Sequence, residues 1–139
     1  IILGEGKKRN QLQALAQSLG VGDDVALPGF VENPFAWMTR SSIFVLSSAW
    51  EGLPGVLIEA LACGCPTVST DCPGGAAEIL ANGLYGMLVP VGDDKALAEA
   101  ILATLDTPPA PELLRKRAAQ FSIEKAVNQY LEVLTTVAA

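Results

Sequence analysis

Short apolar runs alternate along the chain with segments whose apolar residues recur every three or four positions. Runs of the first kind are typical of buried strands, and segments of the second kind are typical of helices with one apolar face. A continuous run such as residues 43–46 indicates a strand that is covered on both faces. The expected strands are residues 1–3, 25–27, 43–46, 67–69 and 86–89.

Capping signals mark where two of the intervening helices begin. Asn33 followed by Pro34 is typical of an N-cap and a first helical residue. Asp93 or Asp94 is expected to cap a later helix in the same way. The expected helices are residues 12–19, 34–40, 56–62, 76–80 and 97–105, a segment ending near 117, and residues 122–136.

Five alternations of strand and helix predict an α/β fold, namely a Rossmann-like parallel sheet with helices on both faces. In sheets of this kind, ligands bind beyond the carboxyl ends of the strands, where loops meet the N-termini of helices. The sequence therefore places function in the loops at residues 4–6, 28–31, 47–55 and 71–75.

Composition narrows the classes of function. The chain has 139 residues, of which 50% are hydrophobic and 17% charged, which suits one folded domain. A net charge of −6, with no basic cluster larger than residues 7–9, argues against nucleic acid as a partner. The basic residues at 7–9 are expected to be solvated charges at a helix start. The apolar runs are too short to span a membrane.

Candidate metal ligands are few in this sequence. The absence of histidine removes the commonest general base and the commonest metal ligand. Cys63, Cys65 and Cys72 are odd in number and are expected to be unbridged, mostly buried thiols in a reducing cytoplasm. Acidic pairs at 23–24 and 93–94 are better explained as turn and cap residues. No metal and no cofactor is expected.

Two acids stand out in an otherwise apolar stretch. Glu59 lies within the apolar helix expected at residues 56–62, and Glu51 lies eight positions earlier in a glycine-rich loop. A carboxylate buried without a partner costs several kcal/mol, so Glu59 must either reach solvent or hold a ligand. The alternative is an ordinary outward-facing helix residue.

The loop Glu-Gly-Leu-Pro-Gly at residues 51–55 joins a buried strand to that helix. Its glycines allow a ligand to approach the backbone, and the free N–H groups at a helix start suit a phosphate. Pro54 has no N–H, which leaves Gly52, Leu53, Gly55 and Val56 as the candidate donors. An anion site flanked by two acids that accept from hydroxyls would suit a sugar nucleotide. An ordinary strand-to-helix turn is the alternative.

The two acids form an E-x7-E pattern, which begins Ser48-x-x-Glu51-Gly52-Leu53-Pro54 and ends Glu59-Ala60-Leu61-Ala62-Cys63-Gly64-Cys65-Pro66. This pattern resembles the donor-binding half of retaining group 1 (family 4) glycosyltransferases of the GT-B fold. The likeness continues through Gly4-Glu5-Gly6, Gly29-Phe30-Val31, Gly74-Gly75-x-x-Glu78 and Gly86-x-Leu88-Val89-Pro90. It is most like bacterial enzymes that build surface polysaccharides.

The resemblance implies a role for each matching residue. Glu51, the candidate catalytic residue, would hold hydroxyls of the donor sugar, and Glu59 would bind the ribose. Backbone N–H groups in the segment from Gly52 to Val56, with Leu53, Pro54 and Gly55 between them, would meet the sugar and diphosphate. Gly4, Phe30 and Val31 would frame the base. Transfer in this family retains the anomeric configuration and generally needs no metal.

The resemblance also implies what lies outside this chain. It begins at Ile1 without a methionine and is expected to be a piece of a longer protein. The diphosphate-binding Arg and Lys of the family and its acceptor-binding domain would precede Ile1. The piece alone is therefore expected to be inactive, and the acceptor, a glycan or a lipid-linked glycan, would bind the missing domain. Gly55 stands where relatives often have Asn, which could alter a contact to the donor sugar.

The expected organisation is a donor-binding domain at residues 1–121 and a C-terminal helix at 122–139 that crosses back to the acceptor domain. In the present chain the apolar face of this helix (Val127, Leu131, Leu134) could be exposed, which predicts self-association. The protein is expected in the cytoplasm, with peripheral contact to the inner face of the membrane left open for the full-length protein.

Other functions compete with that of a glycosyltransferase as explanations of this sequence. A non-catalytic nucleotide-sugar binding module or a sugar-nucleotide epimerase of the same fold stays open. A dinucleotide dehydrogenase is excluded, because Gly4-Glu5-Gly6 is followed by Arg9 where the fingerprint needs a third glycine. A pure interaction domain would explain the fold but not the paired acids.

Overall fold

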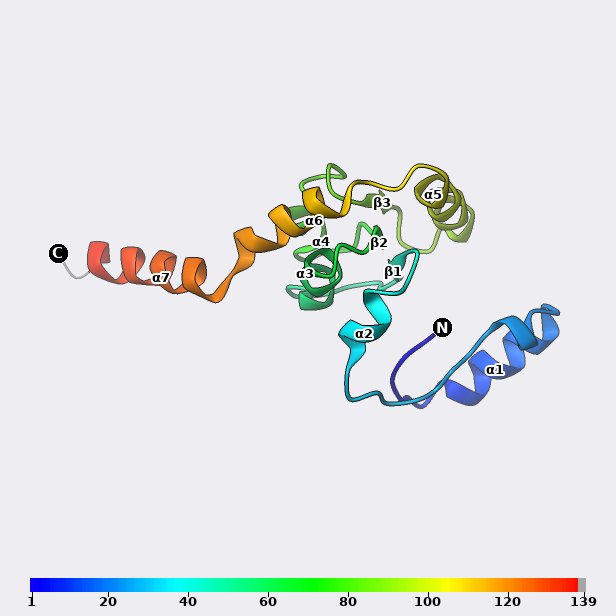
Figure 1. Cartoon of the computed structure of the whole chain (residues 1–139). Coiled ribbons are helices and arrows are strands. Elements are labelled where there is room, and N and C mark those ends of the chain that lie inside the picture. Colours follow the sequence, from blue (N-terminus) through cyan, green and yellow to red (C-terminus); the bar gives the residue numbers. More distant parts are fainter. Residues whose placement is uncertain (138–139) are drawn as a thin grey trace. The chain divides into compact units, whose positions relative to one another are not determined.

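The computed structural model describes residues 1–137, so the last two residues of the segment expected at 122–139 lie outside the described residues. The chain divides into two compact units, Ile1–Ala36 and Trp37–Ala139, and each is described by itself. Figure 1 shows the elements of both units in chain order.

The first unit contains helix α1 (Arg9–Ser18), the short 3-10 helix η1 (Gly22–Asp24) and the start of α2 (Pro34–Met38). Strands predicted at residues 1–3 and 25–27 are wrong: these segments meet only in an isolated parallel bridge between Leu3 and Gly29. Two backbone hydrogen bonds hold them, from Ile2 N to Ala26 O at 2.9 Å and from Gly4 N to Gly29 O at 2.8 Å. Pro28 has no N–H to donate, which prevents the ladder from extending.

The second unit contains a parallel sheet of β1 (Phe44–Leu46), β2 (Thr67–Thr70) and β3 (Met87–Val89), in the order β1-β2-β3. Val45 pairs with Val68, and Ser69 pairs with Leu88. The central strand is buried along its whole length. The three strands predicted in this part of the chain are confirmed, together with their parallel direction.

Helices cover both faces of this sheet, as predicted (Figure 1). On one face α3 (Gly55–Ala62), α4 (Ala76–Ile79) and α6 (Pro111–Ala118) pack together through fully buried side chains. These side chains are Leu57, Leu61, Ala76, Ile79, Leu80 and Leu114. On the other face α5 (Asp94–Asp106) contributes Ala100, which packs with Val68 and Val89.

Side-chain caps form where the sequence predicts them. The Ala96 N–H donates to Asp93 Oδ1 at 2.9 Å, so Asp93 rather than Asp94 is the N-cap of α5. The Ala36 N–H donates to Asn33 Oδ1 at 3.2 Å, and α2 begins at Pro34. Helix α2 ends at Met38, two residues before the predicted end.

Arg117 joins α6 to the end of α4. Its Nε donates to the carbonyl oxygen of Ile79 at 2.8 Å, and its Nη2 donates to that of Glu78. The guanidinium carbon lies 5.3 Å from the ring centroid of Tyr85 and 4.8 Å from that of Phe121. A cation at the C-terminal end of a helix satisfies carbonyl groups that have no partner within the helix.

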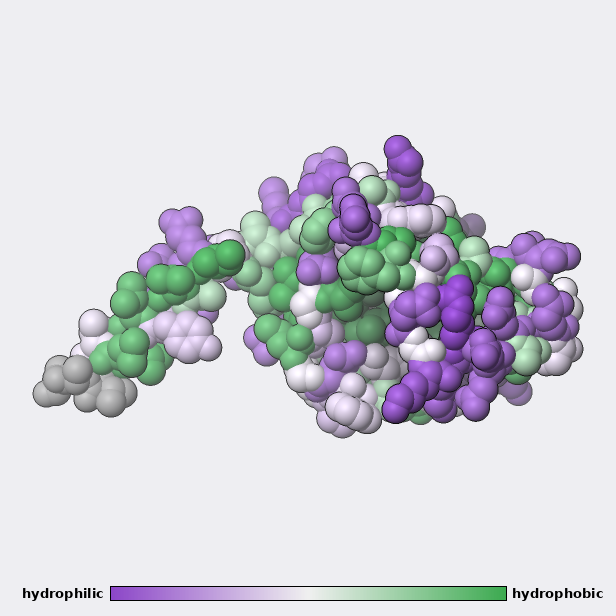
Figure 2. All heavy atoms as spheres, turned by 90° about the horizontal axis from the view of Figure 1, so that it is seen from below, coloured by the Kyte–Doolittle hydropathy of each residue, from purple (hydrophilic) through white to green (hydrophobic). Residues whose placement is uncertain are grey.

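The chain continues through η2 (Ala119–Phe121) into α7 (Ile123–Val137). Figure 2 shows apolar side chains gathered along α7. Val127, Leu131 and Leu134 are 49%, 53% and 63% exposed, which confirms the predicted exposure of this apolar face. Among residues 1–137, no helix combines the length and the apolar character that a membrane crossing requires.

Candidate functional site

The loop at residues 47–54 leaves the carboxyl end of β1 and leads into α3. Its start is fixed to the neighbouring strand by Thr70, the last residue of β2. The Thr70 hydroxyl is buried and donates to the carbonyl oxygen of Ser48 at 2.5 Å, with Leu46 O farther away at 3.4 Å. The loop therefore lies at the carboxyl edge of the sheet, where parallel sheets bind their ligands.

Glu51 is half-buried in this loop. The Ser48 hydroxyl donates to Glu51 Oε1 at 2.6 Å. Hydrogen bonds to a carboxylate are short and strong, so this one fixes the side chain. Within the described residues, Oε2 has no hydrogen bond and remains able to accept one from a ligand.

The predicted loop at residues 71–75 packs directly against Glu51. The Glu51 N–H donates to Pro73 O at 3.1 Å, and the Gly75 N–H donates to Gly52 O at 2.7 Å. Gly74 has a φ of +129° and lies against the carbonyl groups of Glu51 and Gly52. The sequence indicated that both loops lie at one edge of the sheet, but it did not indicate a role for Gly74. The pair of glycines at 74 and 75 was the one feature of the sequence that pointed to an unusual backbone there.

The backbone donors predicted at the start of α3 are partly engaged. The Gly55 N–H donates to Leu53 O at 2.8 Å, and the Leu57 N–H donates to the carbonyl oxygen of the buried Pro54 at 2.9 Å. This leaves the amides of Gly52, Leu53 and Val56 without a partner in the part of the chain that the structure describes. Three of the four candidate donors therefore remain open to an anion.

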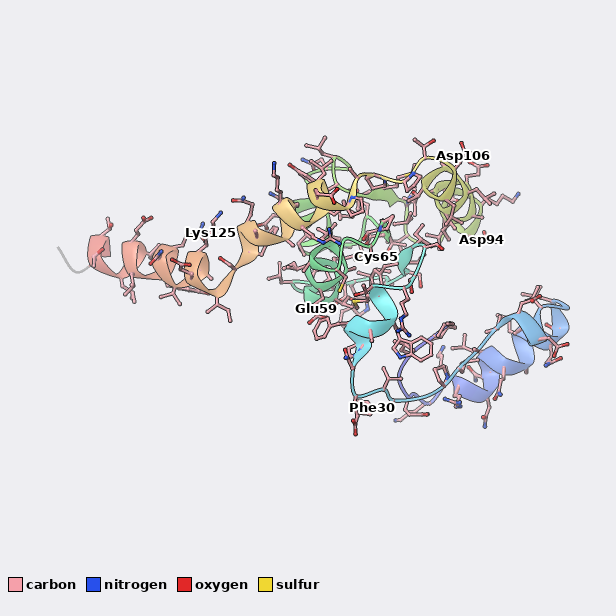
Figure 3. All side chains as sticks on the ribbon, in the orientation of Figure 1. Phe30, Glu59, Cys65, Asp94, Asp106 and Lys125 are labelled. Atoms are coloured by element: carbon pink, nitrogen blue, oxygen red, sulfur yellow. The ribbon has the colours of Figure 1, made fainter. Side chains whose placement is uncertain are left out.

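Glu59 lies on α3 but is exposed (Figure 3). The buried residues of this helix are Leu57, Ala60 and Leu61, which share the opposite face. The structure therefore favours the alternative of an outward-facing helix residue, because the Glu59 carboxylate reaches solvent and is not desolvated. Its role as a ribose ligand stays a prediction.

Gly4, Phe30 and Val31 belong to the first unit and are described within it. Gly4 has a φ of +101° and bonds through its N–H to Gly29, the residue before Phe30. Phe30 is 79% exposed, and Val31 is half-buried. The hydrogen bond between Gly4 and Gly29 therefore brings the three residues predicted to frame the base close to one another within the first unit.

Arg9 differs from the solvated charge that the sequence indicated. Its Nη1 lies 3.0 Å from Glu5 Oε1, and its Nη2 donates to the carbonyl oxygen of Leu27. The side chain joins the loop at residues 4–6 to the segment that precedes Phe30. Arg9 therefore has a structural role in the first unit.

The cysteines are unbridged, and Cys65 and Cys72 are buried, as expected. Burial, with a smaller contribution from the nearby Cys63, raises the pKa of the Cys65 thiol to about 11. A thiol of this kind stays protonated at neutral pH and is a poor nucleophile and metal ligand. In residues 1–137 no three acidic or cysteine side chains lie close enough together to hold a metal ion. Transfer without a metal stays a prediction.

Neither tryptophan lies in the core. Trp50 precedes Glu51 and is 80% exposed, and Trp37 is 38% exposed. Glu78 lies in the first turn of α4 and does not cap this helix. No side chain caps α4, whose N-cap residue is Gly75.

Comparison with known proteins gives one family. A family model described as "Glycosyl transferases group 1" matches residues 1–121. A Campylobacter jejuni protein named N-acetylgalactosamine-N,N'-diacetylbacillosaminyl-diphospho-undecaprenol 4-alpha-N-acetylgalactosaminyltransferase is 37% identical over 106 residues, which are 76% of this chain and 29% of that protein.

Two further proteins are similar over nearly the whole chain. The lipopolysaccharide core biosynthesis glycosyltransferase LpsE of Rhizobium meliloti is 33% identical over 97% of this chain and 41% of its own length. The apo structure of the lipopolysaccharide outer core galactosyltransferase WaaB superposes with a TM-score of 0.86 at 22% identity, covering 97% of this chain and 40% of that one. The chain thus spans less than half the length of each of these proteins.

Proposed function

This chain belongs to the group 1 glycosyl transferases, and from that premise we propose that it binds the nucleoside diphosphate sugar donor of a retaining glycosyltransferase. The observation that carries the proposal is the position of Glu51. It is half-buried in the loop that joins the carboxyl edge of a parallel sheet to the start of α3, and Ser48 donates to its carboxylate. Such an edge is where α/β folds bind nucleotides.

Each part of the donor has a matching group in this proposal. The amides of Gly52, Leu53 and Val56, with the positive end of the α3 dipole, bind the diphosphate. Glu51 accepts hydrogen bonds from sugar hydroxyls through Oε2, and Glu59 accepts them from the ribose. Gly4, Phe30 and Val31 frame the base. Catalysis then comes mainly from orientation of the donor and stabilisation of the leaving diphosphate.

The acceptor in this proposal is a glycan or a lipid-linked glycan. Support comes from the names of the relatives, one of which acts on an undecaprenol-linked sugar and another in lipopolysaccharide core biosynthesis. Under this proposal the protein works in the cytoplasm, with peripheral contact to the inner face of a membrane when the acceptor is lipid-linked.

The proposed donor-binding domain is residues 1–121, and the segment at residues 122–139, whose described part contains α7, packs on the acceptor-binding part of a longer protein. The end of the family match at residue 121 supports this boundary. The transfer reaction needs that longer protein, so the present chain is tested for binding.

The experiment is saturation-transfer NMR of this chain with UDP, GDP and ADP, because the method detects binding in the millimolar range, about −4 kcal/mol. We expect one nucleotide to show ribose contacts, and we expect Glu59→Ala to abolish them. Glu99→Ala on α5 is the matched control, since Glu99 is also an exposed helical glutamate. Absence of binding by all three nucleotides would contradict the proposed function.

A further inference from the structure

Ser48 holds the acid at the centre of the proposed donor site. Its hydroxyl donates to Glu51 Oε1 at 2.6 Å, three residues along the same loop. A glutamate side chain has three rotatable bonds, and a half-buried carboxylate in a loop needs a fixed partner to keep one orientation. Ser48 is the side chain that supplies this partner.

The backbone of Ser48 is itself held by a hydrogen bond from the neighbouring strand β2. The Thr70 hydroxyl donates to the Ser48 carbonyl oxygen at 2.5 Å, and Thr70 is only 4% exposed at the end of β2. Two hydrogen bonds therefore connect the central strand β2, through Ser48, to the Glu51 carboxylate. Rigid support of this kind is what keeps a binding group within the narrow range of geometry that a ligand requires.

We propose that Ser48 is a positioning residue for Glu51: it occupies Oε1 and so directs Oε2 to the hydroxyls of the donor sugar. This inference rests on the proposed function and deepens it, because it separates recognition of the sugar from recognition of the nucleotide. Within residues 1–137, the Ser48 hydroxyl is hydrogen-bonded to Glu51 and to none of the backbone amides at the start of α3. Its loss therefore weakens binding of the sugar part alone.

The first test needs no ligand. Three-bond NMR couplings of the Glu51 side chain report whether one rotamer is populated, with Glu51→Gln used to assign the signals. We expect a single rotamer in the wild-type protein and in Ser48→Thr, which keeps the hydroxyl, and averaged rotamers in Ser48→Ala. Ser47→Ala removes a hydroxyl from the exposed neighbouring residue and serves as the matched control. Averaged couplings in the wild-type protein overturn the inference.

The second test compares each nucleotide with its sugar ester, using UDP and UDP-galactose, GDP and GDP-mannose, and ADP and ADP-glucose. For the pair that binds, we expect Ser48→Ala to weaken the sugar ester roughly three- to ten-fold, which is the effect of losing about one typical hydrogen bond. The free nucleotide binds Ser48→Ala as it binds the wild type. Ser48→Thr restores the affinity for the ester.

A double-mutant cycle separates positioning from general damage to the loop. If Ser48 acts through Glu51, Ser48→Ala has no further effect in the Glu51→Gln background. Equal weakening of nucleotide and ester, or full additivity in the cycle, overturns the inference. Failure of all three nucleotides to bind the wild type contradicts the proposed function instead, and the rotamer measurement then still decides the role of Ser48.

Discussion

Gly74 lies against the carbonyl group of Glu51 so closely that no side chain fits between them. A Cβ on Gly74 would stand 2.7 Å from Gly52 O and closer still to Glu51 O, and the φ of +129° at this position is one that other residues rarely adopt. The loop that carries Glu51 and the loop that follows β2 therefore form one packed structure.

Gly74→Ala should destabilise the fold by about 2–4 kcal/mol, the sum of overpacking and an unfavourable φ. Gly55→Ala is the matched control, because a Cβ at Gly55 meets nothing within 4 Å and its φ is not positive. We expect this control to be neutral or to stabilise by up to about 1 kcal/mol. Urea denaturation measures both, and equal midpoints for the two variants would show that residue 74 is not constrained.

Arg117→Met should lower the free energy of unfolding by about 2–3 kcal/mol. The variant keeps the aliphatic stem but removes a charged donor from the carbonyl groups of Ile79 and Glu78, and it removes two cation–π contacts. Arg115→Met on the same helix removes an exposed arginine whose ion pair with Glu112 is 3.7 Å long. Thermal unfolding of the two variants should differ by several degrees, and identical curves would count against this role of Arg117.

Stability should fall as the pH rises from about 9 to about 11, because of Cys65. Its pKa is 9.0 in an unfolded chain and about 11 in the fold, so within this interval only the unfolded state loses the proton. The contribution is fully present below pH 9 and is lost as the pH rises through the folded pKa, on the order of 2 kcal/mol in total. Urea titrations at several pH values, with Cys65→Ala as the reference, measure it; the same slope in both proteins would exclude Cys65 as the source.

The apolar face of α7 should cause the chain to self-associate at high concentration. Val127, Leu131 and Leu134 are exposed on one side of this helix, and burial of such a face is favourable. Sedimentation velocity at increasing concentration should show a rising mean mass that Leu131→Glu reduces. Asn128→Glu adds the same charge to the polar side of α7 and should not change it. A monomer at all concentrations is the contrary result.

The strands of the second unit could be predicted from the sequence because each is a short run of apolar or β-branched residues, although only β2 is buried along its whole length. The segments at residues 1–3 and 25–27 are short apolar runs too, but they form only a single bridge, between Leu3 and Gly29. Pro28 has no N–H to donate, which prevents a longer ladder there. Local composition does not reveal how many hydrogen bonds a strand will make with a partner distant in sequence.

The candidate site shows the same limit. The sequence indicated both loops and the acid at Glu51, because strand ends and glycines are local signals. It left the burial of Glu59 open, since apolar neighbours in sequence are not neighbours on one helix face: Leu57 and Leu61 turn inward, and Glu59 turns outward. The close approach of Gly74 to Glu51 depends on how two loops meet, and the adjacent glycines at 74 and 75 do not by themselves reveal it.

The fixed backbone of the loop at residues 47–54 carries one large side chain that stands mostly in solvent. Trp50 is 80% exposed and directly precedes the acid held by Ser48, whereas Leu53, 62% exposed, lies against Gly75. Substitutions of Trp50 should leave the scaffold intact while they change the surface beside Glu51. Natural divergence within the family, and libraries made in the laboratory, can therefore change which ligand this loop binds with little loss of folding stability.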